Sequence, residues 1–235
     1  MAEDSAILDL VSSANIACGY HAGDATSMRE TVRAAHARGV AIGAHPSYPD
    51  ITGFGRRELG LEPPEIRRHV AAQVRALKQV CADEGARLTH VKPHGALYNR
   101  AAHHSGTARA IIGGMTEVDP GLTLLGLAAS AMQRVAGETG IAFASEAFAD
   151  RAYGNDLQLV TRGQPGAVID DPSLAVGRGV QIVTRNTVTT LAGAELRVDA
   201  ISLCVHGDNP QALEILRALW LRLQSAGVRI APFVS

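Results

Sequence analysis

Leu88-Thr89-His90-Val91-Lys92-Pro93-His94-Gly95 joins a short apolar run to a polar cluster that contains a glycine. The run Leu88–Val91 has the length and composition of a buried strand, and the cluster after it is typical of a loop at a strand end. The same order recurs along the chain, with similar runs at 14–17, 40–44, 122–127, 141–144 and 200–205. Such runs alternating with helical patterns predict an α/β fold with a parallel sheet.

Helical patterns lie between these runs. One of them has apolar residues spaced four, four, three and four apart, at Ile66, Val70, Val74, Leu77 and Cys81. This spacing places them on one helical face, and Pro63 and Pro64 suit the start of that helix. A second apolar stripe follows Pro210, at Leu213, Leu216, Trp220 and Leu223. Parallel strands linked by helices form a closed barrel or an open doubly wound sheet, and both carry their sites at the C-terminal ends of strands.

Composition excludes several classes of protein. The 235 residues contain 22 Lys plus Arg against 23 Asp plus Glu, a net charge of −1, and 4% aromatic residues, so nucleic acid is not an expected partner. Hydrophobic residues at 46% are typical of a globular protein, and we expect one domain over residues 1–235. Three cysteines without CxxC spacing, no membrane-length apolar run and no signal pattern predict a cytoplasmic protein without a membrane partner.

Histidines and carboxylates follow four of the predicted strands. The pairs in chain order are His21 with Asp24, His45 with Asp50, Lys92 with His94, and His206 with Asp208. Strand ends of a barrel meet at one mouth, so four such ends favour a functional site over ordinary loop residues. His90 alternates with Lys92 and is expected on the same face.

A further polar cluster follows the run 141–144. It contains Glu146 and Asp150 as candidate acids or bases, and Arg151 and Arg162 as candidate carboxylate or phosphate ligands, with Tyr153 beside them. Lys92 and Lys78 are the only lysines among 22 basic residues, so Lys92 is a candidate for a role that arginine cannot fill. Neither lysine follows a glycine, which excludes a Walker-type ATP site, and no GxSxG segment is present.

Six segments match one known family in order, from about Leu8 to near the C-terminus. They are SANIACGYHAGD (13–24), GAHPSYPD (43–50), FGR (54–56), VKPHGALYN (91–99), EAFADR (146–151) and CVHGD (204–208). In these segments the chain resembles the LamB/YcsF family, whose members form the A subunit of the prokaryotic ATP-dependent 5-oxoprolinase. The resemblance implies a distorted TIM-like β/α barrel, related to the glycoside hydrolase and deacetylase barrels. It also implies ring opening of 5-oxoproline to L-glutamate, with ATP, together with 5-oxoprolinase subunits B and C.

The resemblance also assigns roles to residues. It implies catalytic roles for His45, Lys92, His94, Asp24, Asp50, His206 and Asp208, and substrate binding by His21, Arg56, Tyr98, Glu146 and Arg151. Lys92 is expected to stabilise a phosphate or oxyanion, the histidines to transfer protons, and the aspartates to orient the histidines or serve as base. ATP is expected to bind mainly to the partner subunits, given the missing Walker motif.

One departure from the family concerns the first strand. Family members typically begin with a strand carrying Asp-Leu-Asn-x-Asp-x-Gly-Glu-Gly, whereas this chain begins Met1-Ala2-Glu3-Asp4-Ser5. We therefore expect a barrel that lacks this strand and its carboxylates. A divalent metal is a candidate cofactor, with His21, His45 and His94 as candidate ligands. Two alternatives stay open: a stand-alone metal-dependent amide hydrolase of the deacetylase type, and a non-catalytic subunit that binds 5-oxoproline.

Overall fold

The computed structural model describes residues 2–234, which divide into two compact units. Unit 1 contains residues 2–12, 127–129 and 145–233, and unit 2 contains residues 13–126, 130–144 and 234. The chain therefore passes from unit 1 into unit 2 and back more than once. A single domain over residues 1–235 stays a prediction from the sequence.

Parallel strands form the main sheet, and the order of the strands across the sheet is their order along the chain. The strands are β1 (Ser13–Ala17), β2 (Ala41–His45), β3 (Leu88–Val91), β4 (Thr123–Leu127), β5 (Phe143–Phe148) and β8 (Ser202–Cys204). Hydrogen bonds join them in the order β1-β2-β3-β4-β5-β8, with parallel pairing in β1–β2, β2–β3, β3–β4 and β5–β8. A doubly wound sheet reverses its strand order, so this continuous order has the winding of a β/α barrel. The predicted α/β class is confirmed, and each predicted run overlaps a strand. The run 141–144 was placed too early, because β5 continues to Phe148 and so contains Glu146.

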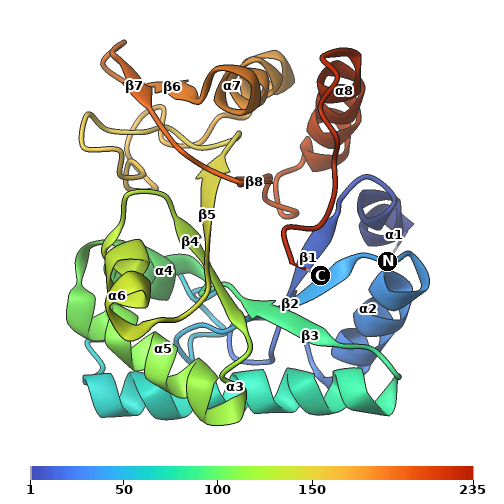
Figure 1. Cartoon of the computed structure of the whole chain (residues 1–235), viewed down its shortest axis with the longest axis vertical. Coiled ribbons are helices and arrows are strands. Elements are labelled where there is room, and N and C mark those ends of the chain that lie inside the picture. Colours follow the sequence, from blue (N-terminus) through green and yellow to red (C-terminus); the bar gives the residue numbers. More distant parts are fainter. Residues whose placement is uncertain (1, 235) are drawn as a thin grey trace. The chain divides into compact units, whose positions relative to one another are not determined.

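Helices connect most of these strands (Figure 1). They are α1 (Ala2–Leu8), α2 (Ala25–Ala37), α3 (Pro63–Asp83), α4 (Gly95–His103), α5 (Ser105–Val118), α6 (Ala131–Thr139), α7 (Pro172–Arg185) and α8 (Ala212–Ser225). Pro63 and Pro64 occupy the first positions of α3, as predicted, and every residue of its predicted apolar stripe is buried. Within residues 2–234, no helix has the length and apolar character needed to cross a membrane.

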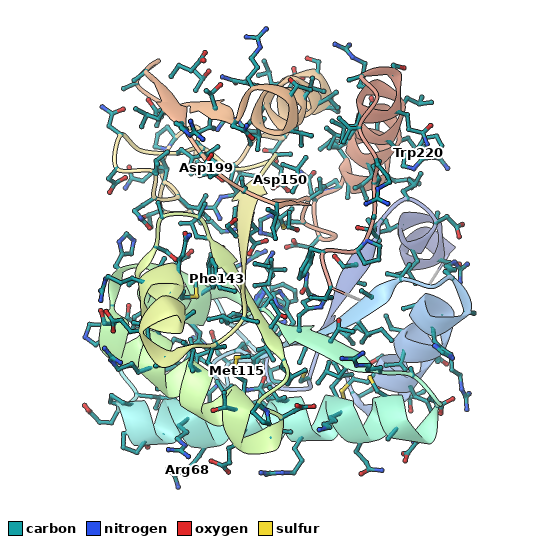
Figure 2. The ribbon with its side chains drawn as sticks, in the orientation of Figure 1. Arg68, Met115, Phe143, Asp150, Asp199 and Trp220 are labelled. Atoms are coloured by element: carbon teal, nitrogen blue, oxygen red, sulfur yellow. The ribbon has the colours of Figure 1, made fainter. Side chains whose placement is uncertain are left out.

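The core of unit 2 depends on a close approach between α3 and α5. A Cβ atom on Gly114 of α5 would lie 2.7 Å from the carbonyl oxygen of Arg67 and 2.9 Å from Cβ of Val70, so only glycine allows this contact. Met115, the next residue on α5, is fully buried, whereas Arg68 on α3 points away from the helix pair (Figure 2). The two helices thus share a tightly packed apolar seam.

The core of unit 1 lies between α7 and α8. Its buried members are Ala149, Ala175, Val176, Ile215 and Leu219. The predicted stripe on α8 is therefore only partly right, because the buried face is formed by Ala212, Ile215, Leu219 and Leu223. Leu213, Leu216 and Trp220 are half-buried on the flank of that face. On this face Leu219 packs closely against α7, where a Cβ on Gly179 would lie 2.5 Å from Leu219 Cδ2.

An antiparallel hairpin in unit 1 was not predicted from the sequence. It pairs β6 (Thr187–Thr189) with β7 (Glu195–Arg197). Asn186, in the left-handed conformation with φ of 54°, ends α7 and turns the chain directly into β6. Three-residue strands give too short an alternation to be recognised from the pattern. β8 is likewise shorter than the predicted run 200–205.

Replacing Gly43 with alanine tests the packing between β2 and β3. A Cβ at Gly43 would lie 2.1 Å from Nε2 of His90, which is fully buried and bonded to Asn15 and Thr89. We expect Gly43→Ala to lower the free energy of unfolding by about 1–3 kcal/mol, because His90 has no room to move. Gly137→Ala on α6, where an added Cβ would meet no other atom, is the control. This substitution should raise the free energy of unfolding by about 0.5–1 kcal/mol. Urea denaturation measures both, and unchanged stability of the first variant contradicts the packing argument.

Candidate active site

Three imidazole rings of unit 2 lie together beyond the ends of β1, β2 and β3. His45 is the last residue of β2, and His21 and His94 follow β1 and β3 within four residues. The rings of His21 and His94 are stacked, with centroids 4.0 Å apart and planes 8° apart. The ring of His45 meets that of His94 edge-on at 4.8 Å. The structure thus brings together the three histidines that the sequence placed at these strand ends.

A chain of hydrogen bonds runs through two of these rings. His45 Nδ1 lies 2.6 Å from the carbonyl oxygen of Lys92, His45 Nε2 lies 3.1 Å from His94 Nδ1, and His94 Nε2 lies 2.9 Å from the carbonyl oxygen of Phe54. Both carbonyl oxygens can only accept. All three bonds form only when the two rings together hold three N–H hydrogens, one more than two neutral imidazoles carry. A proton taken up by this pair would complete all three bonds, although burial and the neighbouring charges oppose its uptake.

Lys92 lies at the end of β3 and is 5% exposed. Its Nζ is 5.9 Å from the centre of the Tyr98 ring, which is also buried. The pKa of His45 is lowered well below its ordinary value by burial, and further by the neighbouring His94 and Lys92. A buried ammonium group at a strand end suits the binding of an oxygen atom that carries negative charge.

Two glycines allow the loop around Phe54 to reach the histidines. Gly55 has φ of 66°, and a Cβ there would lie 2.9 Å from Cδ2 of His94 and 3.0 Å from Cβ of His21. Gly95, at the start of α4, has φ of 57°, and its Cβ would lie 2.4 Å from the Gly55 carbonyl oxygen. That oxygen accepts a hydrogen bond of 2.9 Å from the Ala96 N–H. Glycine is required at both positions.

The candidate metal ligands do not fit a metal ion in this arrangement. Both ring nitrogens of His45 and of His94 are engaged in hydrogen bonds, and His21 has only Nε2 outside such a bond. Within the part of the chain that the structure describes, no group of three His, Cys, Asp or Glu side chains is placed to hold a metal ion. A ligand set would need the bonds among the histidines to break first.

Two of the predicted catalytic aspartates have other partners than histidine. Asp24 is the N-cap of α2, and its side chain accepts from the Ser27 N–H at 2.8 Å. Asp50 accepts from the Gly53 N–H at 3.0 Å and forms an ion pair with Arg57, which keeps the pKa of Asp50 below its ordinary value. The prediction that these carboxylates orient histidines is therefore wrong. Each instead satisfies backbone donors three residues ahead in the chain.

Arg56 and His90, two further candidates, have distinct environments. The Arg56 guanidinium lies over the Phe54 ring, 4.9 Å from its centre, and so stays at the edge of the histidine cluster. His90 is fully buried in the sheet, where its Nε2 lies 3.0 Å from Asn15 Oδ1 and its Nδ1 lies 2.9 Å from Thr89 Oγ1. Burial, with Lys92 nearby, lowers the pKa of His90 to about 3.

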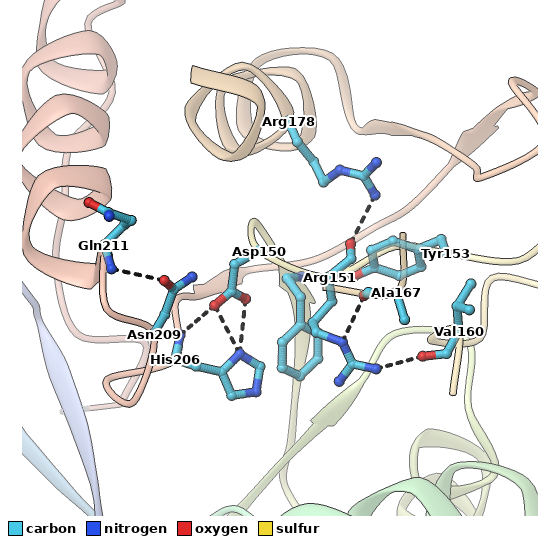
Figure 3. Close-up of polar contacts among 10 residues, drawn as sticks. Asp150, Arg151, Tyr153, Val160, Ala167, Arg178, His206, Asn209 and Gln211 are labelled. Atoms are coloured by element: carbon cyan, nitrogen blue, oxygen red, sulfur yellow. Dashed lines mark hydrogen bonds and ion pairs between the residues drawn. The ribbon is translucent and has the colours of Figure 1, made fainter. Parts of the chain in front are cut away.

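An Asp–His pair occupies the strand ends of unit 1 (Figure 3). Asp150, two residues after β5, accepts from the His206 backbone N–H at 3.0 Å and from His206 Nδ1 at 2.9 Å. Burial alone would raise the pKa of Asp150, but the hydrogen bonds and the charge of His206 outweigh it, and the pKa is lowered. The His206 ring stacks on Phe148 at 5.4 Å. With Nδ1–H held by Asp150, neutral His206 has its lone pair on Nε2.

Asp150 therefore replaces Asp208 as the carboxylate that orients His206. Asp208 is exposed, two residues beyond the histidine. Asn209, which the sequence did not single out, closes this loop: its N–H donates to the His206 carbonyl at 3.2 Å, and its Oδ1 accepts from the Gln211 N–H at 2.9 Å. The loop is thus tied to the start of α8.

Arg151 is a structural residue rather than a free carboxylate ligand. Its Nε donates to the Ala167 carbonyl at 3.2 Å and its Nη2 to the Val160 carbonyl at 2.6 Å, while its own carbonyl accepts from Arg178 (Figure 3). Burial, and then the charge of Arg162, lowers the pKa of Arg151 to about 10. The predicted role in gripping a substrate carboxylate conflicts with these bonds, which pin the loop after β5 in place.

Glu146 and Tyr153 are the remaining candidates of unit 1. Both side chains are fully buried. The Tyr153 Oη accepts the Phe148 backbone N–H at 2.7 Å, so this residue completes the hydrogen bonding at the end of β5, and burial raises its pKa. Arg162 is half-buried in the loop that Arg151 holds.

Sequence reasoning missed Ser47, which contacts the histidine cluster, and Gln73, which holds the Ser47 backbone. Ser47 Oγ lies 2.9 Å from His21 Nδ1, and the fully buried Gln73 bonds to the Ser47 backbone. A signal was present for Gln73, because it is a polar residue on the buried face of α3, between Val70 and Val74. Ser47 carried none beyond its place in a strand-end loop.

Acid should destabilise the protein through its buried neutral histidines. Burial, and then Arg56, lowers the pKa of His21 to about 4, and that of His90 is about 3, against an ordinary 6.5. Between pH 6.5 and 4 the unfolded chain binds protons that the folded chain does not. The free energy of unfolding should therefore decrease as the pH is lowered through this range, by up to about 1.4 kcal/mol per pH unit for each histidine.

Urea denaturation at pH 6.5 and pH 5 measures this slope. His90→Gln should make it shallower, whereas His36→Gln, at an exposed position on α2, is the matched control. Equal slopes in wild type and His90→Gln would contradict the assignment of His90 as a buried neutral ring.

Comparisons with known proteins agree on one family. The model of the LamB/YcsF family matches residues 1–235. The 5-oxoprolinase A subunit of Streptomyces avermitilis is 45% identical, covering 99% of this chain and 93% of that protein, and its counterpart of the same name in Bordetella pertussis is 48% identical, covering 98% and 91%. The crystal structure of the lactam utilization protein from Thermus thermophilus has a TM-score of 0.91 at 44% identity, covering 98% of this chain and 92% of that one. This chain belongs to the LamB/YcsF family.

Proposed function

We propose that this chain is the A subunit of a 5-oxoprolinase, an enzyme that opens the lactam of 5-oxoproline to L-glutamate at the expense of ATP. The names of relatives at 44–48% identity support this activity, as does the lactam utilization protein of the same fold. The structural observation that carries it is the buried cluster of His21, His45 and His94 beside Lys92 at the ends of three parallel strands. Such a cluster can bind and protonate a small polar ring.

The reaction itself defines what the protein must supply. Water attacks the lactam carbonyl carbon, a C–O bond forms, the ring C–N bond breaks, and the nitrogen leaves as an amine. The attacking water needs a proton acceptor, the carbonyl oxygen needs donors while it carries negative charge, and the leaving nitrogen needs a proton. The five-membered lactam is unstrained and stabilised by resonance, so hydrolysis is coupled to ATP.

Each unit by itself holds residues that match some of these needs. Within unit 1, we assign a proton acceptor to His206 Nε2, because Asp150 holds the opposite nitrogen and stabilises the imidazolium that forms. Lys92 is assigned to the negative charge on oxygen. The His45–His94 pair, with its place for a third N–H hydrogen, is assigned to hold the proton that the leaving nitrogen needs, and the bond between the two rings must open for its transfer. No step is assigned to a metal ion, because the ring nitrogens of that pair are engaged.

Partners and co-substrate complete the proposal. The names of the relatives denote one subunit of a larger enzyme, which implies an assembly of several subunits. We propose that the partners are 5-oxoprolinase subunits B and C, and that they bind most of the ATP, since this chain has no Walker motif. Location in the cytoplasm remains a prediction of the sequence.

Glutamate release from 5-oxoproline and ATP, by this chain mixed with its partner subunits, tests the function. Turnover is expected only when the partners and ATP are both present. Lys92→Met should reduce the rate to below about a tenth, whereas Lys78→Met, at the only other lysine, should not, because Lys78 pairs with Asp119 on the surface. Activity without ATP or partners would favour a stand-alone hydrolase instead. Binding of 5-oxoproline without turnover would favour a non-catalytic binding subunit.

Asp150→Asn tests the proposed base. Asparagine keeps the size of the side chain but removes the charge that stabilises protonated His206. We expect kcat to fall by about 100-fold or more with KM little changed. Asp199→Asn is the matched control, because Asp199 is an exposed carboxylate of the same unit, paired only with Arg197 (Figure 2). A loss of less than about threefold in Asp150→Asn would remove the pair from the chemistry.

A further inference from the structure

His21 is held by Ser47 in a single tautomer. Its Nδ1 lies 2.9 Å from Ser47 Oγ, which in turn lies 2.8 Å from the Tyr48 carbonyl oxygen. The carbonyl can only accept, so it takes the one hydroxyl hydrogen of Ser47. Both bonds form only when His21 Nδ1 carries the hydrogen and donates it to Ser47. A neutral His21 ring then has its lone pair on Nε2.

Ser47 is itself fixed by a glutamine in the core. Gln73 of α3 is fully buried, and its Oε1 accepts the Ser47 N–H at 3.0 Å. Its Nε2 donates to the carbonyl oxygens of Ser47 at 2.8 Å and of His69 at 3.0 Å. Burying an amide on an apolar helix face is costly unless its polar atoms are paired, and here each finds a partner in the backbone. The Ser47 backbone therefore cannot shift away from His21 without breaking these bonds.

The plane of the His21 ring is fixed as well. It stacks on His94 at 4.0 Å and meets the Phe54 ring edge-on at 5.5 Å, with planes 85° apart. Gly55 packs against its Cβ. Position, plane and tautomer are thus all determined by neighbours in unit 2, and the ring is pre-organised for one interaction.

The remaining ring nitrogen, Nε2, is available to a ligand. Among residues 2–234 it makes no hydrogen bond with a side chain or backbone group, whereas Nδ1 is bonded to Ser47. Burial and the charge of Arg56 keep the ring neutral, with a pKa of about 4. The Lys92 ammonium of the same unit is a donor, whereas neutral His21 presents an acceptor.

We propose that His21 is the specificity-determining residue for the lactam, and that its Nε2 accepts the hydrogen bond of the substrate ring N–H. The inference rests on the proposed function, and it adds how the protein recognises the ring nitrogen of the substrate. Cyclic substrates that carry a ring N–H are accepted, and rings with oxygen at that position are rejected. Ser47 and Gln73 are positioning residues, because they act on the substrate only through the tautomer of His21. A neutral acceptor facing a ring oxygen would leave two lone pairs opposed.

Binding of two ligands by the full chain, alone and with its partner subunits, tests this assignment. The ligands are 5-oxoproline and the lactone in which oxygen replaces the ring N–H, with both dissociation constants measured by calorimetry. Wild type should prefer the lactam by roughly tenfold. His21→Asn, which retains a donor toward Ser47 but has no atom at the Nε2 position, should lose this preference. His21→Gln, which can place an amide oxygen near the Nε2 position, should keep part of it.

The tautomer gives a second readout that does not depend on the substrate. Nitrogen NMR of histidine-labelled chain should show His21 with hydrogen on Nδ1 in wild type and in Ser47→Thr. Ser47→Ala should lose that preference and weaken lactam binding without affecting the lactone. A His21 ring with hydrogen on Nε2, or an unchanged lactam-to-lactone ratio in a folded His21→Asn, would overturn the proposal. Failure of the wild type to bind 5-oxoproline, even with partners, would instead overturn the proposed function together with this inference.

Discussion

Burying imidazole rings at the ends of parallel strands is the constraint on which unit 2 depends. Each ring loses water on burial, so its nitrogens need partners inside the protein, and four histidines of this unit meet that need in different ways. His45 and His94 share a bond between their rings and each uses a backbone carbonyl, His90 uses side chains of its sheet, and His21 uses Ser47. Glycines at 43, 55 and 95 supply the space that these rings require. The cluster is consequently rigid before any ligand arrives.

Most of the fold could be predicted from the sequence, because burial produces periodic patterns. The apolar runs located the strands of the main sheet, and the stripe from Ile66 to Cys81 located α3 together with its buried face. The hydrophobic pattern failed where a strand was very short, or where apolar residues occur on more than one face of a helix. The three-residue strands β6 and β7 have almost no period, and on α8 the buried face lies to one side of the predicted stripe.

The candidate site was predictable in residue type and less so in role. Strand-end position alone located His21, His45, Lys92 and His94, since parallel strands bring their ends together. The hydrogen-bond partners of these side chains could not be predicted from strand-end position, because a carboxylate binds the nearest suitable donor. For Asp24 and Asp50 this donor is a backbone N–H three residues ahead, and for His206 the partner is 56 residues back in the chain. Local backbone geometry determines the partners of Asp24 and Asp50, and the tertiary fold determines the partner of His206.

The division of the chain between the two units has a consequence for its synthesis on the ribosome. Nearly all of unit 2 lies between residues 13 and 144, so its sheet and its histidine cluster can form while the rest of the chain is still being translated. Unit 1 must wait, because α1 packs against α8, and these helices stand at opposite ends of the chain. Closing such a distant contact is slow. Helix α1 therefore has no α8 to pack against until the end of unit 1 has been translated.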